Sequence, residues 1–416
     1  MNTPWISDKW FVSPYNYIDE IRRDFNLPEK VLIHDVTLRD GEQQPGIVFR
    51  KNEKIEIAIA LDEAGVDRIE VGIPVVSQED FEAIKELSRQ GLRAMVTAFV
   101  RCLKSDVDLA LKAEVPGVVM ELPSSEHMIV YAYQWPIEKA IERAVEAVEY
   151  AKQHGLYVSF FTIDATRADM GFLRKVVDSV HHAMDSLTLA DTFGVCIPSA
   201  ISYIVKNIKN FVKKPIEIHA HNDFGLAVAN TIAAVTSGVS VAHVAVNGIG
   251  ERAGNADLAE VVASLHILLN VKTNVKLERL YELSKLVEKY SGVKVPPQKP
   301  IVGETPYKIE SGIIVDWWLN VKDVKPIEAL PILPTLVGKK DVEIVLGKKS
   351  GAANIKYWLS RLGVKIDDEN LVRSILLDVK KSSIELKRPL TIDEFKEILR
   401  KRGITTSFQE TLSSIY

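Results

Sequence analysis

The 416-residue sequence predicts an α/β protein, a (β/α)₈ TIM barrel followed by a small α-rich C-terminal region. From about residue 30, short β-rich runs alternate with helical stretches, and eight such runs fit into the length typical of one barrel, about 250 residues. The first run leads into a charged segment, whereas an open doubly wound sheet would place a glycine-rich turn there. These two observations favour a closed parallel barrel.

The predicted strands are short and rich in β-branched and aromatic residues. They cover residues 31–37, 68–73, 93–100, 117–122, 157–163, 186–191, 216–220 and 242–248. Between them, residues 51–65 and 136–155 place apolar side chains three and four positions apart and end in glycine, which predicts amphipathic helices. We therefore expect the barrel domain to span residues 30–290.

Two further segments flank the predicted barrel. Five large aromatic side chains fall within the first 17 residues, so we expect residues 1–29 to form an arm that packs on the main body or on a second subunit. Residues 291–416 are expected to form a linker and C-terminal lid subdomains, because four prolines fall within 294–306.

Two helices are predicted beyond the linker, at 351–363 and 391–403. The second helix begins with a capping box, in which Thr391 is the N-cap residue and Glu394 stands three positions later.

The composition excludes several classes of function. Lys and Arg total 52 against 56 for Asp and Glu, and the net charge of -4 does not suit a nucleic-acid partner. No apolar run is long enough to cross a bilayer, and the first residues lack the layout of a signal peptide. Cys102 and Cys196 cannot form a disulfide framework and are expected to be buried thiols in a reducing cytoplasm. We expect a cytoplasmic protein that acts on small molecules.

Polar residues gather where three predicted strands end. Residues 39–43 follow the first strand, 219–223 end the seventh and 247–255 follow the eighth. Strands one, seven and eight are neighbours once a barrel closes, and barrel enzymes carry their chemistry at the carboxyl ends of the strands. These segments are therefore the expected site.

A metal site is expected within this group. His219 and His221 are two positions apart, so on a strand both side chains lie on one face. Two imidazoles and one carboxylate commonly hold a divalent cation, and Asp40 is the nearest carboxylate by topology. Asn255 could add an amide oxygen. The alternative is that both histidines simply line the barrel.

Arg39 stands beside the expected metal ligand Asp40. There it could hold a substrate carboxylate or stabilise an oxyanion. The alternative is a structural salt bridge with Asp40 or Glu70.

At these residues the sequence resembles the metal-dependent barrel acyltransferases that include the isopropylmalate, homocitrate and citramalate synthases, to which hydroxymethylglutaryl-CoA lyase is more distantly related. Residues 38–43 with Lys54 match the first signature, and residues 216–229 match the second. Weaker similarities extend the resemblance over residues 30–365. They lie at Ser124, His127, Met128, 164–167, 191–194, 250–255 and 346–351.

The resemblance implies a Claisen-type condensation of acetyl-CoA with a 2-oxo acid, followed by thioester hydrolysis. The implied product is a 2-hydroxy dicarboxylate or tricarboxylate. The implied cofactor is a divalent metal, Mg²⁺, Mn²⁺, Zn²⁺ or Co²⁺, and the related synthases form homodimers. The residues implied for catalysis are Arg39, Glu42 and Glu310, and those for substrate binding are Arg39, Gln43, Glu70, Phe99, His127, Thr166 and Thr192.

The sequence departs from the synthase pattern at proton-transfer positions. The synthases usually carry Glu where this chain has Ile163, and His where it has Ile309 and Ile314. An isoleucine cannot transfer a proton. Glu310, Lys308 and Tyr307 could substitute for these groups.

Phe99 bears on the choice of oxo acid. Homocitrate synthases tend to have His near this position, whereas an apolar Phe would leave a distal carboxylate unpaired. A short or apolar 2-oxo acid is therefore expected, unless Arg101 pairs with that charge.

Two other functions stay open at this point. One is a carbon–carbon lyase, although residues 248–255 lack the reactive Cys that hydroxymethylglutaryl-CoA lyases carry there. The other is a metal-binding barrel that has lost catalysis and serves as a partner subunit.

Overall fold

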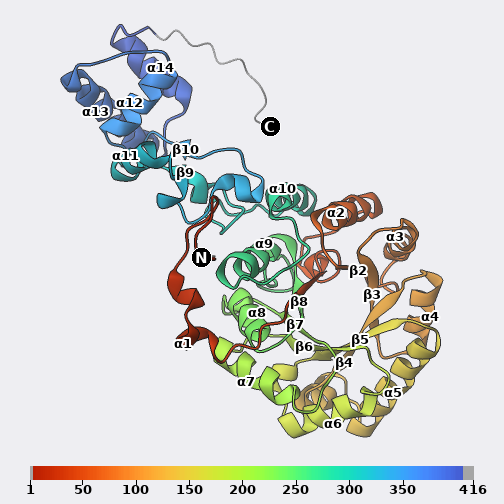
Figure 1. Cartoon of the computed structure of the whole chain (residues 1–416). Coiled ribbons are helices and arrows are strands. Elements are labelled where there is room, and N and C mark those ends of the chain that lie inside the picture. The colour runs from red at the N-terminus through yellow and green to blue at the C-terminus, as the bar shows by residue number, and fades with distance from the viewer. Residues whose placement is uncertain (1–2, 406–416) are drawn as a thin grey trace.

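The computed structural model describes residues 3–405, and its main body is a closed barrel of eight parallel strands (Figure 1). Each strand pairs with the next in sequence, and β1 pairs with β8 to close the barrel. The TIM-barrel prediction is therefore confirmed. The strands are β1 Leu32–Asp35, β2 Arg68–Gly72, β3 Met95–Arg101, β4 Gly117–Pro123, β5 Tyr157–Ile163, β6 Ser186–Asp191, β7 Ile216–Ala220 and β8 Val241–Val244.

Two strands end at least two residues before their predicted ends. The expected first strand ran to residue 37, but the Asp35 carboxylate accepts hydrogen bonds from the backbone N–H and hydroxyl of Thr37, which turn the chain. The expected eighth strand ran to residue 248, but a short 3₁₀ turn follows Val244, with Asn247 at φ 60°. Both corrections lie at the carboxyl ends of strands, where the chain bends to form the loops of the site.

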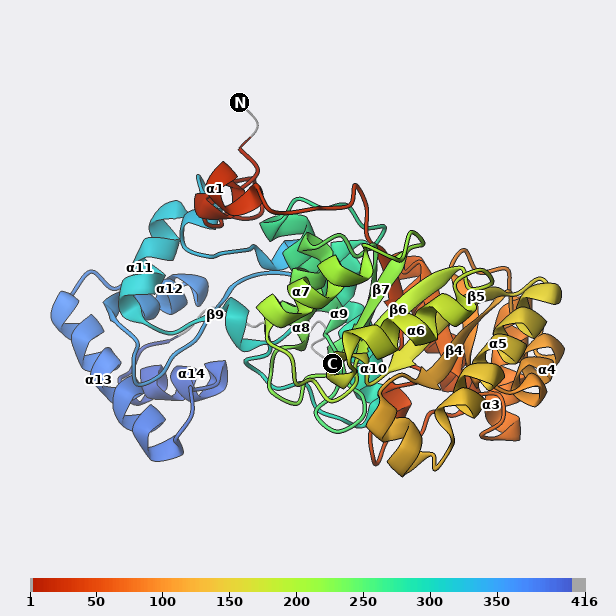
Figure 2. The same cartoon turned by 90° about the horizontal axis from the view of Figure 1, so that it is seen from below.

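Helices surround the barrel and cover its outer face (Figures 1 and 2). The alternating buried residues of the strands and the apolar faces of these helices form one continuous core. The predicted helices at 51–65 and 136–155 correspond to α2 and α5. The helices that follow the eight strands, together with α10, are α2 Lys51–Ala64, α3 Gln78–Arg89, α4 Lys104–Lys112, α5 Ile137–Gln153, α6 Met170–Val180, α7 Pro198–Ile208, α8 Ala227–Thr236, α9 Leu258–Ala263 and α10 Leu280–Ser291.

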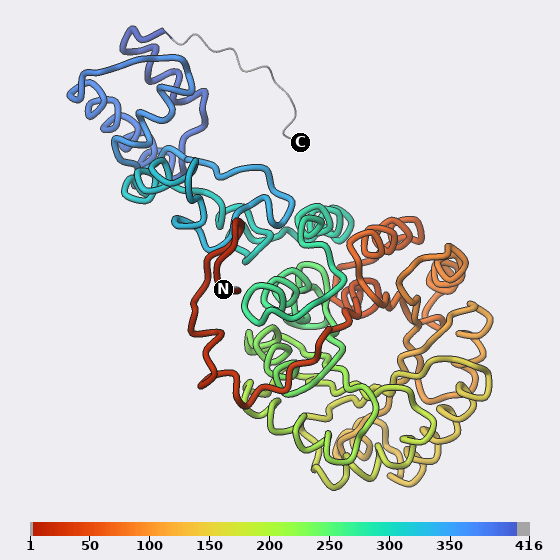
Figure 3. Tube along the Cα trace, viewed as in Figure 1, coloured from red at the N-terminus to blue at the C-terminus, as the bar shows by residue number. Residues whose placement is uncertain are grey.

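The N-terminal segment crosses the outside of the barrel toward the C-terminal region (Figure 3). It contains a short helix, α1 Asp19–Arg22, and Trp10 forms an isolated bridge with Ile332. The Tyr17 hydroxyl donates to the carbonyl of Ile267. Tyr15 is 71% exposed, so the aromatic side chains of this segment do not all pack on the body.

The C-terminal region forms a separate helical cluster beside the barrel (Figure 2). Two strands of two residues, β9 Lys308–Ile309 and β10 Glu343–Ile344, pair at its base. Both helices predicted here are present, and the Thr391–Glu394 capping box forms as expected. Two helices were not predicted. The four helices are α11 Gly312–Val321, α12 Ala352–Arg361, α13 Glu369–Leu386 and α14 Ile392–Lys401.

Within residues 3–405, no helix has both the length and the apolar character needed to cross a membrane.

Candidate metal and substrate site

Asp40, His219 and His221 converge at the carboxyl end of the barrel. Asp40 follows β1, His219 lies on β7 and His221 comes just after β7, where it forms a backbone bridge with Asn255. β8 pairs with both β1 and β7, so the three side chains start from neighbouring positions on the rim. All three are buried.

The facing atoms of these side chains form a small triangle. The Nε2 atoms of His219 and His221 are 3.2 Å apart, and each is 3.7 Å from Oδ2 of Asp40. These separations suit one cation bound by all three atoms at about 2.1 Å. The two imidazole rings meet at 75°, so both ring planes can contain the same point. The donor set therefore fits a divalent metal.

Asn255 lies beside this triangle. Its Nδ2 donates to Oδ1 of Asp40 at 2.7 Å and to the carbonyl of Ile249 at 3.0 Å. Its buried Oδ1 has no hydrogen-bond partner among the described residues. Asn255 therefore orients Asp40 and has a free oxygen. Gly250, at φ 153°, permits this contact, because a Cβ there would lie 2.1 Å from Nδ2 of Asn255.

The charges of the site favour the forms that bind metal. Burial alone would raise the pKa of the Asp40 carboxyl, but Arg39 and His221 hold it below its ordinary value. Burial and the neighbouring His221 ring hold the pKa of His219 well below its ordinary value. A carboxylate and a neutral imidazole are the protonation states that metal coordination requires.

Arg39 is fixed by carboxylates and by an aromatic ring. Its Nη1 donates to Asp40 at 2.8 Å and to Gln43 at 3.0 Å, and its Nε donates to Glu70. The guanidinium carbon lies 4.1 Å from the ring centroid of Phe99. Its Nη2 is buried and has no partner within the described structure, so one donor remains available to a ligand.

A pocket of about 240 Å³ opens above these residues. It brings together seven of the residues singled out from the sequence, namely Arg39, Asp40, Gln43, Phe99, Thr192, His219 and His221. Ile163, noted as a departure from the synthase pattern, also lines it. Met128, Glu251 and Arg252 also line it and lie in segments noted from the sequence, whereas Glu121, Phe161 and Phe193 were not singled out. Strand alternation could have revealed Phe161, because it is two positions before Ile163 on β5.

Two expected residues lie just outside the pocket wall. Glu70 is fully buried beneath Arg39, which supports the structural alternative of a salt bridge. Glu42 contacts Nζ of Lys54 at 2.6 Å and accepts from the backbone N–H of Phe49 at 2.7 Å. Both carboxylates are therefore engaged by neighbouring groups.

Two more expected residues belong to a neighbouring hydrogen-bond network. His127 contacts Asp164 at 2.9 Å, and Thr166 donates to Asp191 at 2.8 Å. Thr192 joins this network to the pocket, because its hydroxyl accepts from the backbone N–H of Asp164 at 2.8 Å.

Glu310 and Ile309 lie in the C-terminal region. Glu310 accepts from the backbone N–H of Lys349 at 2.7 Å, and Ile309 is buried against Val315 and Ile344. Neither lines the pocket within one chain. Arg101 is also outside it, since its guanidinium binds Asp106 at 2.8 and 2.9 Å.

Residues 30–287 match the family model described as HMGL-like. The chain is 46% identical to a probable 2-isopropylmalate synthase of Ignicoccus hospitalis over 90% of this chain and 93% of the relative. It is 39% identical to the homocitrate synthase AksA of Methanothermobacter thermautotrophicus, again over 90% of this chain and 93% of the relative. Identity to the (R)-citramalate synthase CimA of Methanocaldococcus jannaschii is 44%, over 82% of this chain and 69% of the relative.

Among solved structures, the hydroxymethylglutaryl-CoA lyase of Bacillus subtilis matches with a TM-score of 0.60 and 21% identity. The match covers 65% of this chain and 97% of the lyase. At this identity the match supports the barrel fold alone.

Proposed function

The chain belongs to the HMGL-like family, and on that premise we propose that it is an acyltransferase that condenses acetyl-CoA with a 2-oxo acid. Relatives with three different synthase names share 39–46% of its residues over most of its length. The observation that carries the proposal is the pocket, which combines the Asp40–His219–His221 triangle with the guanidinium of Arg39. This combination suits an oxo acid with adjacent keto and carboxylate oxygens.

We propose that Asp40, His219 and His221 hold a divalent metal, with Asn255 as an additional oxygen donor. Such a metal supplies a Lewis acid for the keto and carboxylate oxygens of the substrate. Mg²⁺, Mn²⁺, Zn²⁺ and Co²⁺ are all compatible with two nitrogens and several oxygens.

Arg39 and Thr192 are proposed to bind the oxo acid. The unpartnered Nη2 of Arg39 can donate to an oxygen of the substrate. The Thr192 hydroxyl uses its oxygen to accept from Asp164, which leaves its proton free to donate. Gln43 fixes Arg39 from the pocket wall. Arg39 thus holds the carboxylate of the oxo acid, and the Thr192 hydroxyl stabilises negative charge that develops on the keto oxygen as the new bond forms.

The condensation needs a base that removes a methyl proton from acetyl-CoA. The carbanion attacks the keto carbon, and water then cleaves the thioester to release CoA. Ile163 cannot act as that base, and Glu42 is engaged by Lys54 and Phe49. Glu310 is the remaining expected candidate. Because it lies outside the pocket within one chain, it could act only across a dimer.

We therefore propose a homodimer in which the C-terminal region of one subunit completes the partner's site. Light scattering of micromolar protein should give twice the chain mass of 46.5 kDa. A monomer under these conditions would contradict this part of the proposal.

Thiol release tests the activity. The protein is incubated with acetyl-CoA, each of the four metals and a panel of 2-oxo acids that includes pyruvate, 2-oxobutyrate, 2-oxoisovalerate and 2-oxoglutarate. We expect release of CoA that requires both a metal and an oxo acid. Absence of release with every combination would reject the acyltransferase and favour the partner-subunit alternative.

A further inference from the structure

The pocket has two walls of different chemistry. The Asp40–His219–His221 triangle and Arg39 form a polar wall. Next to it, Phe99, Phe161 and Ile163 belong to a buried apolar cluster formed by strands β3 to β6, and the rings of Phe99 and Phe161 contact Arg39 and His219. An oxo acid whose keto and carboxylate oxygens face the polar wall therefore directs its side chain toward this apolar wall.

One ionisable side chain, Glu121 on β4, interrupts the apolar wall. Its backbone pairs with Arg101 on β3 and with Phe161 on β5. Glu121 lines the pocket, and its carboxylate has no hydrogen-bond or ion-pair partner among residues 3–405. Arg101, the nearest cation along the strand pair, is bound to Asp106 through two hydrogen bonds and is half exposed. The wall that receives the side chain thus contains an acidic group that forms no ion pair among the described residues.

We propose, on the basis of the acyltransferase function above, that Glu121 determines specificity by admitting 2-oxo acids with a neutral side chain and excluding those with a second carboxylate. A second carboxylate on this wall would face a like charge in a partly buried site, where repulsion is poorly screened. It would also lose water, and Arg101, which is bound to Asp106, would not pair with it. A neutral side chain incurs neither penalty and packs on Phe99 and Phe161.

The protonation of Glu121 gives this selection a pH dependence. Burial raises the pKa of the Glu121 carboxyl to about 7, although Arg39 and Arg101 lower it. The carboxylate form, and with it the exclusion, therefore grows as the pH rises through about 7. The titratable and charged groups around Glu121 are Arg39, Glu70, Arg101, Cys102, Asp106 and Tyr133.

The test compares wild type, Glu121→Gln and Glu126→Gln. Glu126 is an exposed residue just beyond β4, so its replacement makes the same change of charge outside the pocket. Calorimetry measures the Kd of 2-oxobutyrate and of 2-oxoglutarate for the Mn²⁺-loaded protein at pH 8 and pH 6, without acetyl-CoA. Thiol release gives kcat/KM for the same two acids. Thermal melting checks that each variant folds.

In wild type, 2-oxobutyrate should bind at least about tenfold more tightly than 2-oxoglutarate at pH 8, and this preference should be smaller at pH 6. Glu121→Gln should reduce that preference by about tenfold at pH 8 and remove its pH dependence, whereas Glu126→Gln should change neither. An unchanged preference in Glu121→Gln, or a wild type that prefers 2-oxoglutarate, would overturn the role of Glu121. Selective binding without thiol release would overturn the acyltransferase alone, and failure of both acids to bind would overturn both proposals.

Discussion

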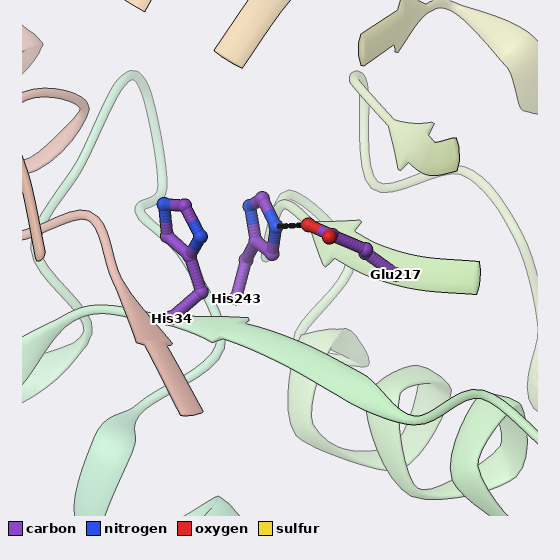
Figure 4. Close-up of side chains that lie close together, drawn as sticks. All are labelled: His34, Glu217 and His243. Carbon is purple, nitrogen blue, oxygen red and sulfur yellow. Dashed lines mark hydrogen bonds and ion pairs between the residues drawn. The ribbon is translucent and has the colours of Figure 1, made fainter. Parts of the chain in front are cut away.

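Two clusters of histidines and carboxylates lie in the same barrel, and they differ in their access to the pocket, in their carboxylate partners and in the orientation of their rings. The outer cluster is Asp40, His219 and His221, which borders the pocket. The inner cluster is His34, Glu217 and His243 (Figure 4), and all three residues are buried. In both clusters the potential ligand atoms lie within 4.8 Å of one another. Distance alone therefore does not separate a metal site from a structural network.

The inner carboxylate is already neutralised and its oxygens are engaged. Glu217 accepts from Nη1 of Arg68 at 2.7 Å through one oxygen. Its other oxygen contacts Nε2 of His243 at 2.7 Å and accepts from Thr188 at 3.2 Å. A cation here would have to compete with a buried arginine for this carboxylate.

The ring geometry also differs between the clusters. The rings of His34 and His243 are stacked, with centroids 4.2 Å apart and planes 14° from parallel. A metal lies in the plane of each imidazole that binds it, and two stacked parallel planes share no such point. His219 and His221 are 75° apart with Nε2 atoms 3.2 Å apart. The comparison shows that ring orientation and an open side, more than proximity, distinguish the outer cluster.

Removing one carboxylate from each cluster should have opposite effects on metal content. Asp40→Ala should lose its bound metal. Its rate of thiol release should fall by more than about a thousandfold, because the Lewis acid and its charge stabilisation disappear. Glu217→Ala should keep one metal per chain. Elemental analysis after dialysis, with the release assay, measures both. Full metal occupancy in Asp40→Ala would reverse the assignment.

Glu217→Ala should instead lower the free energy of unfolding by about 3–5 kcal/mol, since Arg68 would remain buried without its carboxylate. Urea unfolding monitored by circular dichroism measures this. Glu146→Ala is the matched control, because Glu146 and its partner Lys104 are both more than half exposed, and no measurable change is expected. Equal stability of both variants would mean that the inner network contributes little.

The inner cluster should also make stability depend on pH. Burial and the adjacent His243 lower the pKa of His34 from 6.5 to about 4. Between these values the unfolded chain binds a proton that the folded chain does not, so stability falls as the pH drops from 6.5 to 4. The loss is about 3 kcal/mol. His34→Gln keeps an N–H donor but cannot titrate, so urea unfolding across this range should show a smaller loss than in wild type.

The outer cluster could be predicted from the sequence and the inner cluster could not. His219 and His221 lie two positions apart at the end of β7, and Asp40 follows β1, so local spacing and strand order place them together. His34, Glu217 and His243 lie on three different strands, β1, β7 and β8. They meet because His34 pairs with His243 when β1 closes onto β8, and no local pattern in the sequence predicts that strand register.

The same distinction explains the expected residues outside the pocket. The position of Glu310 depends on where the C-terminal helices pack, which barrel periodicity does not determine. Glu121 went unnoticed because a single Glu in the run GVVMEL resembles a strand end. α13 could have been predicted, since its buried Val372, Ile375 and Val379 are three and four positions apart.

Glu70 connects the two clusters and gives the smallest expected effect. One of its oxygens contacts Nε2 of His34 at 3.2 Å, and the other accepts from Nε of Arg39. Glu70→Gln should let Arg39 shift over Phe99 and raise the KM for the oxo acid by about tenfold, with metal content unchanged. His34→Gln, one bond further away, should raise it by about threefold. Because Arg39 is proposed to bind the ground-state carboxylate, kcat should change less than KM in both variants. A fall in kcat with constant KM would instead mean that Arg39 interacts with the transition state alone. No kinetic change in either variant would show that the two clusters act independently.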